Sequence, residues 1–118
     1  MWTIKKEFHF SSAHQLNGLP DTHPCSRLHG HNYVLTLYLQ SSELNEVGFV
    51  EDYRDLDDVK RYVDDILDHK FLNDIFPMDN TTVENMSKIL YDYFKVTHPK
   101  LIAVEMSETP KTNCRYEP

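Results

Sequence analysis

The sequence predicts an α+β fold, with a four-stranded antiparallel sheet and two helices on one of its faces. Segments with strand-like and helix-like patterns occur in the order strand, strand, helix, helix, strand, strand. Because strands and helices come in runs and do not alternate, an antiparallel sheet is favoured over a parallel one. The 118 residues fit a single domain spanning residues 1–118. The open face of such a sheet needs cover, which we expect another subunit to provide.

Two strands are predicted near the N-terminus. Residues 2–12 alternate apolar with polar side chains, which is the period of two of a half-buried strand. Residues 31–40 are rich in β-branched, aromatic and leucine side chains, so they are expected to form the second strand. Residues 16–28 between them carry a glycine and two prolines and are expected to form a loop.

A first helix is predicted over residues 54–69. Its acidic residues fall mainly on one face, and apolar residues recur on the other at helical spacing: Leu56, Val59, Val63, Ile66 and Leu67. Pro77 marks the break after this helix.

A second helix and two short strands complete the predicted sheet and its cover. Thr81 and Glu84 have the spacing of a capping box, with Thr81 as the N-cap. The helix that follows has an apolar stripe formed by Val83, Met86, Leu90, Tyr93 and Phe94. Residues 101–107 indicate a third strand, and residues 114–116 a short fourth one.

Charge and composition exclude several classes of protein. A formal net charge of −7 argues against a nucleic-acid binder, which needs clustered lysine and arginine. No apolar run approaches the roughly 18 residues of a membrane helix. Residues 1–10 have no apolar stretch like that of a signal peptide, so we expect a cytoplasmic protein. Two cysteines are too few for a disulfide scaffold.

Three histidines form the clearest candidate site. His29 and His31 are two residues apart at the start of the second strand, so both side chains project to one side. His14 lies near the end of the first strand, which the loop returns beside the second. Three neutral imidazoles suit Zn²⁺ and leave a fourth position open for water or substrate, as in catalytic zinc sites. An H-x-H pair alone is weak evidence, and the third histidine and a nearby cysteine strengthen it.

Cys25 lies in the proline-containing loop, four residues before His29, and two roles are open to it. As a fourth zinc ligand it would close the site and leave no room for catalysis. As an unligated thiol beside the metal it could serve as an acid/base group. Spacing alone does not choose between these roles.

Two acidic positions later in the chain are further candidates. Asp68 and His69 follow the first predicted helix, and a carboxylate beside an imidazole is the pair that orients a proton-transfer histidine. Stabilisation by the helix dipole is the simpler interpretation of that histidine. Glu108 follows the third strand and could accept two hydrogen bonds from an amidine-like ring edge, as in guanine or pterin recognition. Its simpler interpretation is a solvated turn.

Five segments, in order along the chain, resemble the 6-pyruvoyltetrahydropterin synthase superfamily. They are Phe10-Ser-Ser-Ala-His14, Cys25-Ser-Arg-Leu-His29-Gly-His31-Asn32-Tyr33, Leu67-Asp68-His69 with Leu72-Asn73, Asn80-Thr-Thr-Val-Glu84-Asn85, and Ser107-Glu108-Thr109. The three residues between the cysteine and the His-Gly-His motif are similar to the spacing of the bacterial branch, the 6-carboxytetrahydropterin synthases. The animal-type pyruvoyl enzymes have a longer gap at this position.

The resemblance implies a fold, an assembly and an activity. The fold would be the tunnelling fold (T-fold), in which three protomers join their sheets into a barrel and two trimers stack as a hexamer. Active sites would lie at the subunit interfaces. The substrate would be 7,8-dihydroneopterin triphosphate, and the products would be 6-carboxy-5,6,7,8-tetrahydropterin, acetaldehyde and triphosphate.

The resemblance also implies a role for each candidate residue. The zinc ligands would be His14, His29 and His31. Cys25 would be the catalytic base, with Asp68 and His69 as its proton-transfer partners. Glu108 would anchor the pterin, in a pocket lined by the segment that contains Thr81, Thr82 and Glu84. This match favours the base role of Cys25 over the ligand role.

Two alternatives remain at this stage. One is the sister reaction, which gives 6-pyruvoyltetrahydropterin without carbon–carbon cleavage. The other is a non-catalytic zinc-binding domain closed by Cys25. The pathway is open as well, because queuosine, archaeosine, phage deazapurine and folate-related pathways use similar enzymes.

Overall fold

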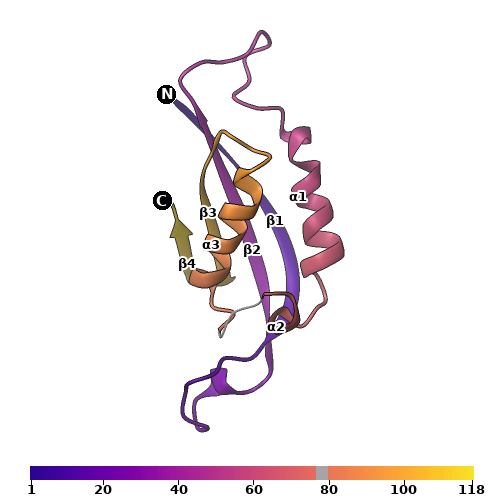
Figure 1. The fold of residues 1–118 in the computed structure, drawn as a ribbon, viewed down its shortest axis with the longest axis vertical. Helices are drawn as coiled ribbons and strands as arrows, with labels where there is room; N and C mark the ends of the chain where they lie inside the picture. The colour runs from indigo at the N-terminus through magenta and orange to yellow at the C-terminus, as the bar shows by residue number, and fades with distance from the viewer. Residues whose placement is uncertain (77–79) are drawn as a thin grey trace.

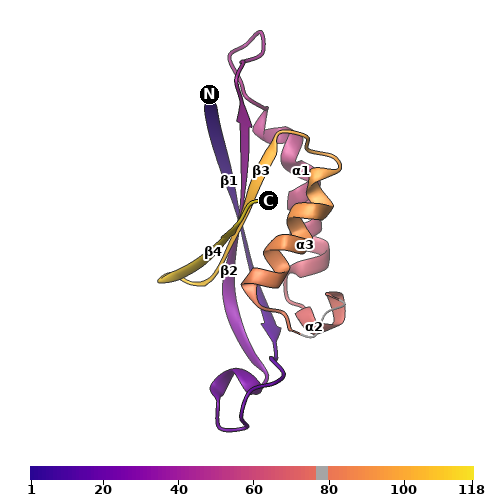
Figure 2. The same ribbon diagram turned by 60° about the vertical axis from the view of Figure 1, so that its left-hand side comes forward.

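The computed structural model describes residues 1–76 and 80–118, which form an elongated molecule with extents of 56 × 25 × 25 Å. Pro77, at which the sequence predicts a helix break, lies outside the described residues. One antiparallel sheet has the order β1-β2-β3-β4, formed by β1 Trp2–His14, β2 His29–Ser41, β3 Leu101–Thr109 and β4 Thr112–Tyr116. The helices lie on one side of this sheet (Figure 1, Figure 2), so the predicted layers and strand order are confirmed.

The hairpin of β1 and β2 runs the length of the molecule. All 13 residues of one strand pair with the 13 of the other without a shift in register, ending at His14 opposite His29. The same register stacks Phe10 on Tyr33, with ring centroids 5.0 Å apart, on the face that the helices cover. Both strands run further than their sequence patterns predict, because the backbone pairing continues through the histidine-bearing ends.

A continuous helical segment covers residues 53–67 and differs from the α-helix predicted over residues 54–69. It consists of a 3₁₀-helix Tyr53–Leu56, α1 Asp57–Tyr62 and a π-helix Val63–Leu67. The wider π turn rotates its last residues about the helix axis. Leu67 is therefore fully buried, whereas Ile66, which the helical spacing places in the core, is 41% exposed.

The helix α3 (Val83–Lys95) begins one residue later than its predicted capping box implies. Its N-cap is Thr82, whose hydroxyl accepts a hydrogen bond from the third backbone N–H of the helix. Thr81, predicted to be the cap, is fully buried and holds an imidazole of the sheet instead. The apolar stripe is confirmed except at Tyr93, which is 57% exposed, while Tyr91 is buried in its place and packs against β4.

Two short helical elements were not predicted: a 3₁₀-helix Pro24–Ser26 and α2 Leu72–Ile75. The buried apolar residues form a core cluster between the covered sheet face and the helices. In the described parts of the chain no helix covers the opposite sheet face (Figure 2). None of the helices described is long and apolar enough to cross a membrane.

Candidate active site

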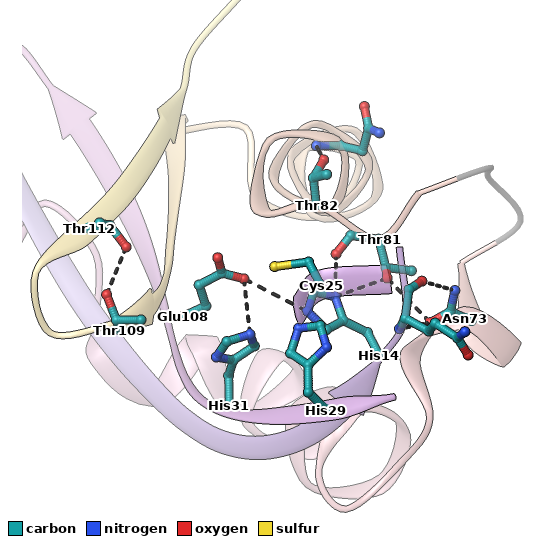
Figure 3. Close-up of polar contacts among 12 residues, drawn as sticks. His14, Cys25, His29, His31, Asn73, Thr81, Thr82, Glu108, Thr109 and Thr112 are labelled. Carbon is teal, nitrogen blue, oxygen red and sulfur yellow. Dashed lines mark hydrogen bonds and ion pairs between the residues drawn. The ribbon is translucent and has the colours of Figure 1, made fainter. Parts of the chain in front are cut away.

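Three imidazoles converge at the end of the hairpin where the loop joins β1 to β2. His14 pairs directly with His29 across the strands, and His31 follows two residues later on the same face. The ring centroids are 4.5 Å apart for His14 and His29, 4.9 Å for His29 and His31, and 5.2 Å for His14 and His31. One nitrogen from each ring lies within 4.8 Å of the other two (Figure 3). The structure therefore brings together the three histidines that the sequence nominates as metal ligands.

Backbone carbonyl groups orient two of these rings. His14 Nδ1 donates to the Thr81 carbonyl oxygen at 2.9 Å and lies 3.1 Å from the Thr81 hydroxyl, and His29 Nδ1 donates to the Arg27 carbonyl oxygen at 2.7 Å. Because a carbonyl oxygen only accepts, the proton is assigned to Nδ1 and the lone pair to Nε2. The Nε2 atoms of His14, His29 and His31 are buried without a hydrogen-bond partner among residues 1–76 and 80–118. Three buried acceptors aimed at one point fit a bound cation such as Zn²⁺.

The electrostatics of the cluster favour neutral rings. Burial lowers the pKa of His14 below its usual 6.5, and the neighbouring imidazoles add to this effect, whereas the Thr81 hydrogen bond opposes it. Burial also lowers the pKa of His31, although the Glu108 carboxylate opposes that shift. Both rings are therefore unprotonated at neutral pH, which is the state that binds a metal.

Cys25 lies in the 3₁₀-helix Pro24–Ser26, within the loop that joins β1 to β2. Its N–H donates to His23 Nδ1 at 3.1 Å and its carbonyl oxygen accepts from the Leu16 N–H at 3.0 Å, so both arms of the loop fix its backbone. In Figure 3 its sulfur is directed to the side of the cluster on which Glu108 lies. The sulfur is not one of the atoms that converge as a metal-binding group. This arrangement favours the acid/base role of Cys25 over the role of a fourth ligand.

Glu108 reaches the imidazoles from β3. Its Oε2 lies 3.6 Å from His31 Nε2 and 3.9 Å from His14 Nε2 (Figure 3). The contact follows from the pairing of β2 with β3, in which Ser107 stands opposite Val34. The sequence nominates Glu108 as a pterin anchor and gives no signal for its contact with the imidazoles.

Glu108 also lines a pocket of ≈ 400 Å³ between α3 and the β3–β4 hairpin. The lining is formed by Val83, Glu84, Glu108, Thr112, Asn113 and Cys114. The structure divides the segment expected to line a pterin pocket: Glu84 faces this pocket, Thr82 caps α3 and Thr81 holds His14. The residues from β4 and its turn were missed, because no motif in the sequence marks them.

Asp68 and His69 lie at the outer edge of β1. His69 Nδ1 is 2.9 Å from Asp68 Oδ2, and Asp68 Oδ1 accepts from the Ser11 N–H at 2.9 Å. These contacts, the Ser11 N–H first and then His69, hold the pKa of Asp68 below its usual range. His69 has a left-handed backbone (φ 56°) and a side chain that is 82% exposed. Within the described part of the chain, no hydrogen bond or ion pair joins this pair to Cys25 or to the imidazole cluster.

Two further residues support the cluster and were missed as functional residues in the sequence. Asn73 bonds both backbone groups of Gln15, the residue after His14, at 3.0 and 2.8 Å, and its Oδ1 lies 3.4 Å from the Thr81 hydroxyl. Tyr33 is 1% exposed, and its ring centroid lies 5.6 Å from that of His31. The period of two along β2 could have found Tyr33, whereas nothing local in the sequence indicates Asn73.

Comparison with known proteins gives matches over nearly the whole chain. Residues 3–118 match a family model described as 6-pyruvoyl tetrahydropterin synthase. A Synechocystis protein named 6-carboxy-5,6,7,8-tetrahydropterin synthase is 34% identical over 125 residues, covering 98% of this chain and 93% of its own. A protein of the same name from Bacillus subtilis is 31% identical over 127 residues, covering 98% of this chain and 84% of its own. The solved structure of Caenorhabditis elegans 6-pyruvoyl tetrahydropterin synthase superposes with a TM-score of 0.85 at 28% identity, over 99% of this chain and 95% of that one. The tunnelling fold of the chain is thereby confirmed.

Proposed function

The chain belongs to the 6-pyruvoyl tetrahydropterin synthase family, and from this premise we propose that it is a zinc-dependent carbon–carbon lyase. It converts 7,8-dihydroneopterin triphosphate and water to 6-carboxy-5,6,7,8-tetrahydropterin, acetaldehyde and triphosphate. The observation that carries the proposal is the convergence of three buried imidazole nitrogens, which have no hydrogen-bond partner in the described part of the chain, beside the Glu108 carboxylate (Figure 3). The names of the two bacterial relatives support this reaction over the sister reaction.

In this proposal His14, His29 and His31 hold Zn²⁺ through their Nε2 atoms. An ion held there would supply Lewis acidity, which would make carbon-bound protons beside the hydroxyl groups of the substrate easier to remove. The carbonyl groups of Thr81 and Arg27 keep two of the rings in the tautomer that presents a lone pair to the metal. Three protein ligands leave room for the substrate at the metal.

Proton transfer is assigned to Cys25 and to the Asp68–His69 pair. Cys25 Sγ takes a proton from the substrate side chain, and His69, oriented by Asp68, supplies or removes another on the opposite face. Both groups must reach one substrate. Because His69 is 82% exposed at the edge of β1, the pair is proposed to serve the site of a neighbouring subunit. We propose that the active sites lie at the interfaces of a homo-oligomer, a hexamer built as a dimer of trimers.

The outer strands support such an assembly. β1 and β4 are the two ends of the sheet. Residues 69–71 bond the outer edge of β1 at Ser11 and Ala13, and no strand of the described chain pairs with the rest of these two outer edges. Backbone groups on an open edge are ready to pair with a strand of another copy. Sedimentation of the purified protein tests the hexamer, and a monomer that is fully active would contradict the shared site.

The pterin is assigned to the pocket beside Glu108. The Glu108 carboxylate can accept two hydrogen bonds from the amidine-like edge of a pterin. Glu84 lines the same pocket, and Thr82 caps the helix α3 from which Glu84 projects. A volume of ≈ 400 Å³ is in the range of pockets for small ligands.

The deciding experiment is an assay with 7,8-dihydroneopterin triphosphate. The protein is expected to release acetaldehyde, and Cys25→Ala is expected to lower the rate at least about 100-fold while keeping its zinc content. An active Cys25→Ala protein would contradict the assignment of the base. Mass analysis of the pterin product separates the lyase from the sister reaction, because only the lyase shortens the side chain to a carboxylate.

Cobalt substitution tests the non-catalytic alternative. A zinc domain closed by Cys25 would show a strong sulfur-to-cobalt absorption band, whereas the open site would not. We further propose that the enzyme acts in the cytoplasm, in deazapurine (queuosine) biosynthesis, without a nucleic-acid or membrane partner. Its two free cysteines suit a reducing compartment, and its genomic neighbours would test the pathway.

A further inference from the structure

The Glu108 carboxylate faces two of the imidazoles, and at His14 it meets an acceptor atom. Glu108 Oε2 lies 3.6 Å from His31 Nε2 and 3.9 Å from His14 Nε2. The Nδ1 proton of His14 is directed to the Thr81 carbonyl oxygen, so its Nε2 presents a lone pair. A carboxylate and buried lone pairs repel one another unless a cation lies between them. This arrangement is therefore expected if three imidazoles and one carboxylate surround one bound cation.

The distances agree with this interpretation. Ligand bonds of about 2.0–2.1 Å in a tetrahedral zinc site place neighbouring ligand atoms about 3.4 Å apart. The separation of Glu108 Oε2 from His31 Nε2 exceeds this value by only a few tenths of an ångström. The side chain of Glu108 is 32% exposed, so it has freedom to complete the approach or to leave.

The same carboxylate has a second task in the proposed function. The amidine edge of a pterin and its side chain lie at opposite ends of a fused two-ring system. When the side chain is on the metal, the amidine edge is a full ring system away from it. A Glu108 carboxylate in contact with the metal ligands therefore cannot bind the amidine edge at the same time.

We propose that Glu108 is the fourth metal ligand in the substrate-free protein and that it leaves the metal to bind the pterin. This inference rests on the proposed function and adds an exchange of ligands to it. Arrival of the amidine edge draws the carboxylate into the pocket lined by Glu84 and Asn113, and the vacated position receives the side-chain hydroxyl groups of the substrate. The metal would thus be shielded from other ligands until the correct ring is bound.

The experiment compares cobalt(II) complexes of the whole protein and its variants without substrate. Glu108→Gln keeps the shape of the side chain but is a poor ligand, and it is expected to bind cobalt at least about tenfold more weakly and to change its visible spectrum. Glu105→Gln is the matched control, because it removes the same charge from the same strand where the carboxylate bonds the Tyr38 hydroxyl. It is expected to retain the wild-type spectrum. In Glu108→Ala, added acetate is expected to restore that spectrum.

Each possible result either supports or overturns the assignment of Glu108 as a metal ligand. An unchanged spectrum in Glu108→Gln would overturn the inference, even with weaker binding, because weaker binding alone would reflect the lost charge. Failure of acetate to alter the Glu108→Ala spectrum would count against it as well. A wild-type protein that binds no cobalt would overturn the proposed zinc site itself, which is a distinguishable result.

Discussion

Acidification of the metal-free protein is expected to weaken its fold through His14 and His31. Burial lowers the pKa of both imidazoles below the usual 6.5, so the unfolded chain takes up protons first as the pH falls. Protons that bind the unfolded chain but not the folded one favour unfolding. The contribution of these histidines to the free energy of unfolding is therefore complete above pH 6.5, and it is lost as the pH falls towards their pKa in the folded protein. Each histidine contributes a slope of at most about 1.4 kcal/mol per pH unit in that window.

Urea unfolding at a fixed protein concentration, with a chelator present, measures this slope between about pH 7 and pH 5. Replacing His14 with glutamine is expected to reduce the slope, by at most about 1.4 kcal/mol per pH unit. His9→Gln is the control, because the His9 side chain is 69% exposed, and it should keep the wild-type slope. Equal slopes for wild type and His14→Gln would refute the reasoning that His14 is held neutral by burial.

Three other substitutions test the packing around the site and the helices. A methyl group at Gly30 would meet the Ser12 carbonyl oxygen at 3.5 Å, an ordinary contact, so Gly30→Ala is expected to change the free energy of unfolding by less than about 1 kcal/mol. Asp58→Ala leaves the His98 imidazole, which is 6% exposed and lies 2.8 Å from that carboxylate, without its partner, and should cost about 1–3 kcal/mol in urea unfolding. Thr82→Ala removes the cap of α3 and should cost about 1 kcal/mol in the same assay. Unchanged urea midpoints for the last two variants would contradict these assignments.

The histidine cluster could be predicted because it depends on local rules. Side chains two residues apart share a face of a strand, and a loop between two adjacent strands returns the chain beside itself. These two rules predict that His14 comes close to His29 and His31, and the register of the hairpin then pairs His14 directly with His29. The Thr81 carbonyl that orients His14 and the Glu108 carboxylate beside it arrive from far along the chain. Their positions depend on how α3 and β3 pack against the hairpin, which no local pattern encodes.

The errors in the helices have a similar cause. Spacing of 3.6 residues placed Ile66 in the core, but the π turn in which it lies has a different period. Threonine caps helices well, so Thr81 and Thr82 are both suitable by residue type. Thr82 is the cap in the structure, and Thr81 is hydrogen-bonded to His14 instead. At Thr81 a contact with a residue distant in sequence, and not the intrinsic preference of the residue, decided the outcome.

His14 and His29 flank the loop of residues 15–28. An ion bound between them would therefore restrict the motion of this loop. An ion held by His14 and His29 would tie the two ends of that loop together, much as a disulfide does. A cross-link around a loop of about 15 residues restricts the unfolded chain by about 3 kcal/mol in the entropic estimate. Cys25 lies within this tied loop. Removal of a bound ion would therefore remove the Lewis acid and would also increase the mobility of the loop that carries the thiol. Hydrogen exchange in this loop should then rise before exchange in the sheet.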